Sequence, residues 1–147
     1  MALGDLFVFD EALRGMIVGP TLVADEVWIG LVTDVCAVDD AIPAYGAGGT
    51  TNYTAIATAG EYAVGGLLLD TIANIVTEAA GVLTFEDTGA SVTWAQNGAS
   101  PQNARFAVVY NHTTKLCYCA IDLAAAVDMQ AGALTITWDA TGMFTIT

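Results

Sequence analysis

The sequence predicts an all-β fold, an antiparallel β-sandwich or jelly-roll-like barrel with a short N-terminal helix. Short runs rich in β-branched and aromatic residues recur roughly every ten residues through the second half of the chain. Clusters of Gly, Asp, Asn and Thr separate these runs and favour turns. Along residues 133–138, apolar and hydroxyl-bearing side chains alternate with the period of two that is typical of a half-buried strand.

The N-terminal segment, residues 6–16, is expected to form the short helix. Phe9, Leu13 and Met16 recur at helical spacing, and Asp5 is suited to cap the first turn. An extended strand remains the alternative for the first four residues of this segment.

The domain organisation follows from the length of 147 residues, which supports one domain. Within it, residues 1–22 are assigned to the N-terminal helix or arm. Residues 23–147 are assigned to the β-sandwich.

The remaining elements follow in chain order. Residues 27–33 form a near-continuous apolar run and predict a buried strand, whereas residues 39–51 predict a long surface loop. No strand is evident from there to Gly66. Further strands are expected at residues 72–77, 82–86, 91–95, 104–111, 116–122, 133–138 and 143–147. Residues 139–142 carry Asp first and Gly fourth, the preference of a type I turn.

The charge balance excludes several kinds of partner. Three Lys and Arg residues stand against 16 Asp and Glu, for a net charge of −13. Nucleic-acid binding needs several clustered cations to displace counterions, so we expect no contact with DNA or RNA. We also expect no membrane contact, because the longest apolar run, residues 63–69, is too short for a span and an anionic surface would repel the chain.

The low charge content predicts that part of the surface is covered by other proteins. Charged residues make up 13% of the chain, against roughly 25% in ordinary soluble domains. A folded monomer of this size exposes about 7,000 Å². Thr-rich strand faces tolerate packing against another protein, although a plain solvent-facing Thr surface is the alternative.

The three cysteines, Cys36, Cys117 and Cys119, are expected to be reduced and buried. Their odd number, with no secretion signal expected, favours a reducing compartment. On a regular strand, Cys117 and Cys119 would share a face. Together with His112 they would still lack a fourth ligand, so we expect no metal.

One segment suggests catalysis, residues 87–90, whose DTGA sequence resembles the catalytic loop of aspartic proteases. Those enzymes need two such aspartates sharing a proton, which a dimer using Asp87 would supply. The protease pattern has a hydrophobic residue where Glu86 stands, and a hairpin turn explains the segment without catalysis. A dimeric aspartic protease is therefore only a distant alternative.

No other catalytic set is apparent, so we expect no enzyme activity and no cofactor. The only serines are Ser91 and Ser100, and the only histidine, His112, lies in a predicted solvated turn. A carbohydrate-binding sandwich, in which Trp28 or Trp94 stacks on sugars, is a further alternative, although buried tryptophans are commoner.

Three stretches in order resemble a family of small structural proteins of tailed bacteriophages and prophages. The first is the N-terminal segment followed by VWIGLVTD at residues 27–34, and the second is ARFAVVYN at residues 104–111. The third is GALTITWD at residues 132–139, followed by GMFTIT at residues 142–147. The chain departs from the family at residues 61–69, which are more apolar than the Thr/Gly-rich turn found there.

The resemblance implies a virion protein, most simply a capsid decoration or cement protein on the outer surface of the head. Its partner would be the major capsid protein, whose neighbouring copies it clamps, and it would itself be a homotrimer. It would be made in the cytoplasm of the bacterial host. A phage tail, tail-tip or fibre component is the alternative.

We expect lattice or self-contacts near the N-terminus and in the loop that begins at residue 39. Ordinary core packing is the alternative for the aromatic residues among them. The candidate contact residues are Phe7, Phe9, Met16, Ile42, Pro43 and Tyr45.

Overall fold

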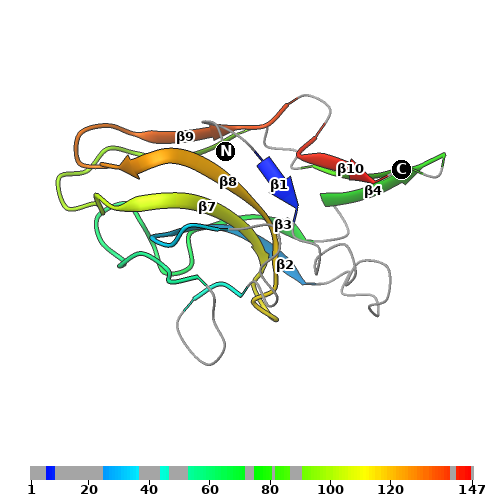
Figure 1. The fold of residues 1–147 in the computed structure, drawn as a ribbon, viewed down its shortest axis with the longest axis horizontal. Helices are drawn as coiled ribbons and strands as arrows, with labels where there is room; N and C mark the ends of the chain where they lie inside the picture. The colour runs from blue at the N-terminus through cyan, green and yellow to red at the C-terminus, as the bar shows by residue number, and fades with distance from the viewer. Residues whose placement is uncertain are drawn as a thin grey trace.

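The computed structural model contains ten strands, β1 to β10, arranged in antiparallel sheets (Figure 1). It describes residues 6–8, 25–36, 44–46, 53–71, 75–80, 82–86, 91–139 and 142–146. No helix occurs among the elements of these residues. The predicted all-β class is confirmed at this level. The described strands form three separate sheets, and none of them closes into a barrel.

The largest sheet has five strands in the order β1-β8-β7-β2-β3. They are β1 (Leu6–Val8), β8 (Cys117–Val127), β7 (Ala104–Asn111), β2 (Glu26–Val32) and β3 (Leu67–Thr71). β2 and β7 lie at its centre and are buried along most of their length. Burial on both faces explains why these two strands read as near-continuous apolar runs.

The N-terminal helix prediction is wrong for residues 6–8, which form strand β1. This strand pairs antiparallel with β8, so that Leu6 lies opposite Ile121 and Val8 lies opposite Cys119. Leu, Phe and Val suit a strand, and the edge of β8 supplies backbone partners that outweigh a short helical pattern. The rest of the predicted helix lies outside the described residues.

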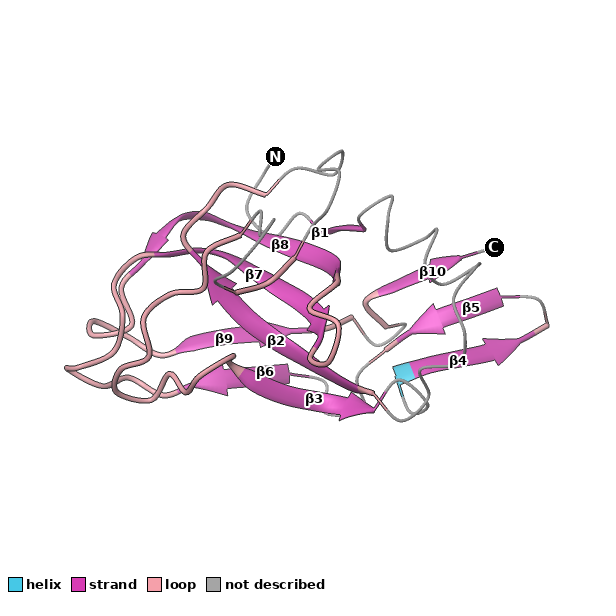
Figure 2. Ribbon diagram, turned by 90° about the horizontal axis from the view of Figure 1, so that it is seen from below, coloured by secondary structure: helices cyan, strands magenta, loops and turns pink. Residues whose placement is uncertain are grey.

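Two smaller sheets complete the fold. β4 (Val76–Ala79), β5 (Val82–Phe85) and β10 (Phe144–Ile146) form a three-stranded sheet in the order β10-β5-β4. It lies at one end of the molecule in both views (Figures 1 and 2). β6 (Ser91–Trp94) and β9 (Leu134–Thr137) form a two-stranded ribbon.

Most predicted strands are present, with three differences. β3 was not predicted, because it begins directly after Gly65 and Gly66 and its residues show no clear alternation. The strand predicted at residues 72–77 is only partly described, since β4 begins at Val76. β8 continues to Val127 instead of ending near residue 122, because the following alanines carry no turn signal.

The predicted turn at residues 139–142 is confirmed by its hydrogen bond. The Gly142 amide donates to the Asp139 carbonyl at 3.0 Å, which closes a four-residue β-turn. The φ angle of Gly142 is +97°, a conformation that glycine adopts without steric cost.

Candidate functional site

The β6–β9 ribbon has one apolar face and one hydroxyl-bearing face. Val92, Trp94 and Ile136 are buried. The side chains between them are exposed and form what we call the hydroxyl face: Ser91, Thr93, Thr135 and Thr137. Ser91 lies opposite Thr137, and Thr93 lies opposite Thr135 with their hydroxyl oxygens 2.9 Å apart. The ribbon therefore presents a surface without charge.

A cleft of about 460 Å³ lies beside this ribbon, between β8 and β9. Most of its lining is apolar and comes from both strands, including Ile121, Leu123 and Val127 of β8 and Leu134 and Ile136 of β9. We call it the β8–β9 cleft. Thr135 and Thr137 of the hydroxyl face also line it, so the cleft and that face are continuous.

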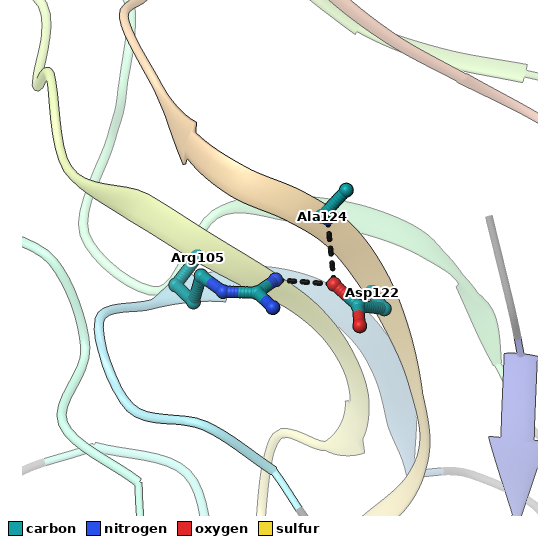
Figure 3. Close-up of polar contacts among 3 residues, drawn as sticks. All are labelled: Arg105, Asp122 and Ala124. Carbon is teal, nitrogen blue, oxygen red and sulfur yellow. Dashed lines mark hydrogen bonds and ion pairs between the residues drawn. The ribbon is translucent and has the colours of Figure 1, made fainter. Parts of the chain in front are cut away.

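The Asp122 carboxylate accepts hydrogen bonds that fix the backbone of β8 beside the cleft (Figure 3). Oδ1 of Asp122 accepts a hydrogen bond from the Arg105 guanidinium and another from the Ala124 amide at 2.6 Å. This arrangement makes β8 bulge. Phe106 pairs with Asp122 and Ala104 pairs with Val127. Four residues of β8 therefore lie opposite the single residue Arg105. The hydrogen bond from Arg105 holds the pKa of the Asp122 carboxyl below its usual value.

Tyr45, one of the predicted contact residues, lies inside the core of the chain. Its side chain is only 4% exposed, and its ring stacks on Tyr110 with centroids 4.1 Å apart. Its hydroxyl lies 2.8 Å from the Tyr62 hydroxyl, which accepts a hydrogen bond from the Leu31 amide. Gly30 leaves room for the ring, since a Cβ there would lie 2.3 Å from Cζ of Tyr45.

The other predicted contact residues are placed only in part. Phe7 lies in β1 with its backbone opposite Ala120. Phe9, Met16, Ile42 and Pro43 lie outside the described residues. The residues that line the β8–β9 cleft were not predicted as a site, because the bulge that shapes it depends on Arg105 and Asp122, which are far apart in the sequence.

The three cysteines form no disulfide and are buried, as predicted. The expectation that Cys117 and Cys119 share a face is wrong, because the register shifts between them. Cys119 pairs with Val109, and Cys117 pairs with Tyr110, the next residue of β7, whose side chain points to the opposite face. Burial raises the pKa of Cys117 and raises that of Cys119 to about 12.

Two of the residues considered for catalysis, His112 and Ser100, have structural partners, and Ser91 is exposed in β6. His112 stacks on Trp28 with ring centroids 4.4 Å apart. Ser100 is buried and accepts a hydrogen bond from the Glu61 amide. Asp87 lies outside the described residues. Within the described part of the chain, no three His, Cys, Asp or Glu side chains are grouped as metal ligands.

The two tryptophans considered for sugar stacking have little free ring surface. Trp94 is buried, and its indole N–H has no hydrogen-bond partner. Trp28 is covered in part by His112, and its indole N–H donates to Glu26 at 2.9 Å. Gly65 lies beside the same ring, since a Cβ there would be 3.6 Å from Cε3 of Trp28. This arrangement disfavours a stacking platform for sugars.

No protein-family model, curated protein or solved structure matches this chain. The family resemblance drawn from the residues therefore stays a prediction. In the part of the chain that the structure describes, no helix is long and apolar enough to cross a membrane.

Proposed function

We propose that the chain is a structural protein of a tailed-phage virion, a decoration protein that binds the outer surface of the head and stabilises contacts between major capsid proteins. The observation that carries this proposal is an uncharged hydroxyl face continuous with an apolar cleft on a chain of net charge −13. A surface without charge can be buried against a partner at little desolvation cost.

The state of the cations supports an outer location. Arg105 is paired with Asp122, and the Lys115 ammonium lies 5.5 Å from the ring centroid of Tyr110. These are the only Lys and Arg residues among the described ones. Because both described cations contact other groups of the chain, they contribute little to binding the phosphates of a packaged genome. We therefore expect the favourable contacts of the chain to be with protein.

We also propose that the β6–β9 ribbon and the five-stranded sheet pack face to face as a sandwich. The ribbon residue Trp94 lies 6.0 Å from Tyr62 between ring centroids, and Tyr62 is hydrogen-bonded to Leu31 in the central strand β2. This contact supports a ribbon that packs over the five-stranded sheet. Such packing leaves the hydroxyl face directed outward, where a capsid subunit or another copy in a homotrimer would cover it.

A decoration protein stabilises the shell through the surface area that it buries against it, and it catalyses no reaction. Each fully buried apolar anchor is worth roughly 1.5–3 kcal/mol, and the gain is repeated at every site of a closed shell. A modest contact per copy therefore suffices to resist internal pressure.

The test is rebinding of the purified protein to shells of the encoding phage that lack it. We expect saturable binding and a higher disruption temperature of the shells. Thr135→Glu places a charge on the hydroxyl face and should weaken binding at least tenfold, whereas Val64→Glu, at a side chain that is 77% exposed elsewhere, should not. Absence of binding removes the proposal, and labelling on tails selects the tail component instead.

A further inference from the structure

The loop that follows β6 contains Asn97, the one asparagine of the chain that precedes a glycine. Its carbonyl accepts a hydrogen bond from the Ser100 amide at 2.9 Å, which closes a β-turn over Gly98 and Ala99. Its side chain joins the same turn, because Oδ1 accepts a hydrogen bond from the Ala99 amide at 2.9 Å. This Asx turn folds the side-chain amide over the peptide bond to Gly98.

The backbone nitrogen of Gly98 is accessible. Gly98 is exposed, and no atom lies within 4 Å of the position that a Cβ would take there. Within the described part of the chain, its amide donates to no acceptor. Asn97 is itself only partly buried, so water and hydroxide reach both groups. The nitrogen can therefore lose its proton and act as a nucleophile toward the neighbouring side chain.

We propose that Asn97 is a site of spontaneous modification in the folded chain, where its amide becomes a carboxylate through a succinimide. Asparagine is among the thermolabile residues. The Gly98 nitrogen attacks Cγ of Asn97 and forms a C–N bond. The bond from Cγ to Nδ2 breaks, and ammonia leaves with the proton of the Gly98 amide. Water then opens the ring at either carbonyl, which gives aspartate or isoaspartate.

Two contacts orient the Asn97 amide for this reaction. Nδ2 donates to Oε1 of Glu61 at 3.1 Å, and this directs Oδ1 to the Ala99 amide. Attack at Cγ moves negative charge onto Oδ1. A backbone N–H at 2.9 Å from that oxygen has the geometry of an oxyanion-hole donor. We therefore expect the reaction in the folded chain to be no slower than in an unfolded peptide of the same sequence.

The modification would change a contact between two loops. The Glu61 amide donates to Oγ of the buried Ser100 at 3.2 Å, so residues 59–62 contact the turn of residues 97–100. After the reaction, the hydrogen bond from Asn97 to Glu61 is replaced by two carboxylates, which repel each other. A chain of net charge −13 also gains one more negative charge. We expect the two loops to separate as the protein ages.

This inference does not depend on a location in a virion, so it is tested by incubating the purified full chain at pH 8. Peptide mapping by mass spectrometry should show conversion of Asn97, and an isoaspartyl methyltransferase should label the isoaspartate product. The rate should equal or exceed that in a synthetic peptide of residues 94–101. Asn103 is the internal control, since it is exposed in the same loop and precedes alanine. It should react at least tenfold more slowly.

Gly98→Ala tests the nucleophile. The open space at Gly98 accommodates the added methyl group, which hinders the approach of the nitrogen to Cγ of Asn97. We expect conversion of Asn97 to slow at least tenfold in this variant.

Asn97→Asp tests the consequence, because it reproduces the aspartate product. Hydrogen exchange of the Glu61 and Ser100 amides should be at least threefold faster in Asn97→Asp than in the wild type. Adding Glu61→Gln removes the repulsion and should restore most of the protection.

Three results would overturn the proposal. They are a rate at Asn97 well below that of the peptide, equal rates at Asn97 and Asn103, and an unchanged rate in Gly98→Ala. Unchanged hydrogen exchange in Asn97→Asp would show that the modification does not separate the loops.

Discussion

Arg105 of β7 and the Ala124 amide of β8 donate to the same oxygen, Oδ1 of Asp122. The Asp122 side chain is 4% exposed and that of Arg105 is 24% exposed. One carboxylate oxygen thus joins two strands and also holds the bulge that borders the β8–β9 cleft. The left-handed φ of Ala124, +64°, is unfavourable for alanine and is maintained by this hydrogen bond.

Removing either partner should destabilise the fold and loosen the cleft. Arg105→Ala leaves Asp122 buried without its cation, and we expect the thermal midpoint to fall by several degrees. Asp122→Asn keeps an acceptor for the Ala124 amide and should cost less than Asp122→Ala. Lys115→Ala removes the same charge outside this pair and serves as the control in calorimetry. A larger loss in Lys115→Ala than in Arg105→Ala would contradict the prediction.

The Arg105–Asp122 pair should also make the free energy of unfolding depend on pH in the acid range. The pKa of Asp122 is lower in the folded chain than its ordinary value of 3.8. The contribution is therefore complete above about pH 5 and is lost as the pH falls through the folded pKa. Urea unfolding of the wild type and of Asp122→Asn should show a difference that shrinks below about pH 4. A difference that is constant from pH 7 to pH 3 would count against the pair.

The sequence predicts the central strands and one turn well, because these depend on local patterns. β2 and β7 are continuous apolar runs, and the turn from Asp139 to Gly142 carries its own residue preferences. Long-range contacts could not be predicted in this way. The sequence predicts Tyr45 on a surface loop, whereas the room left at Gly30, the stacked ring of Tyr110 and the hydroxyl of Tyr62 make it a core residue. The bulge of β8 likewise depends on Arg105, a residue of another strand.

The slot at Gly30 should be intolerant of any side chain. Gly30→Ala would place a Cβ 2.3 Å from Cζ of the buried Tyr45, so a backbone or ring must shift. We expect a loss of about 1–3 kcal/mol in the free energy of unfolding, measured by urea denaturation. Gly98→Ala, where nothing lies within 4 Å of the added Cβ, should stay within about 0.5 kcal/mol of the wild type. Equal effects of the two substitutions would be incompatible with the slot.

The thiols should be unreactive while the chain is folded. Cys36, Cys117 and Cys119 are buried, and burial raises the pKa of Cys119 to about 12, so little thiolate is present at pH 8. Ellman's reagent should therefore react with these thiols only in denaturant or at the rate of unfolding. Fast reaction of any of the three in the native protein would show that a thiol is accessible.

Above pH 10 the folded state should lose stability. Burial, the first cause for each group, raises the pKa of Tyr45, Tyr62 and Tyr110 above the usual value of 10. A raised folded pKa means that the stabilising contribution is present below pH 10 and declines as the pH rises beyond it, because unfolding releases the protons. Tyrosinate absorbance should appear together with loss of the native circular dichroism. Absorbance from all five tyrosines before unfolding would contradict this.

The indole N–H of Trp94 is buried without a hydrogen-bond partner, so we expect position 94 to tolerate phenylalanine. An unsatisfied buried donor costs about 1–3 kcal/mol. Trp94→Phe removes that donor and leaves a small cavity, so the two effects oppose each other. We expect the free energy of unfolding to change by less than about 1 kcal/mol. Trp94→Ala, which removes the buried ring beside Tyr62, should cost about 3–5 kcal/mol. A loss above about 2 kcal/mol in Trp94→Phe would mean that the N–H has an acceptor in solution, and amide and indole hydrogen exchange would then locate it.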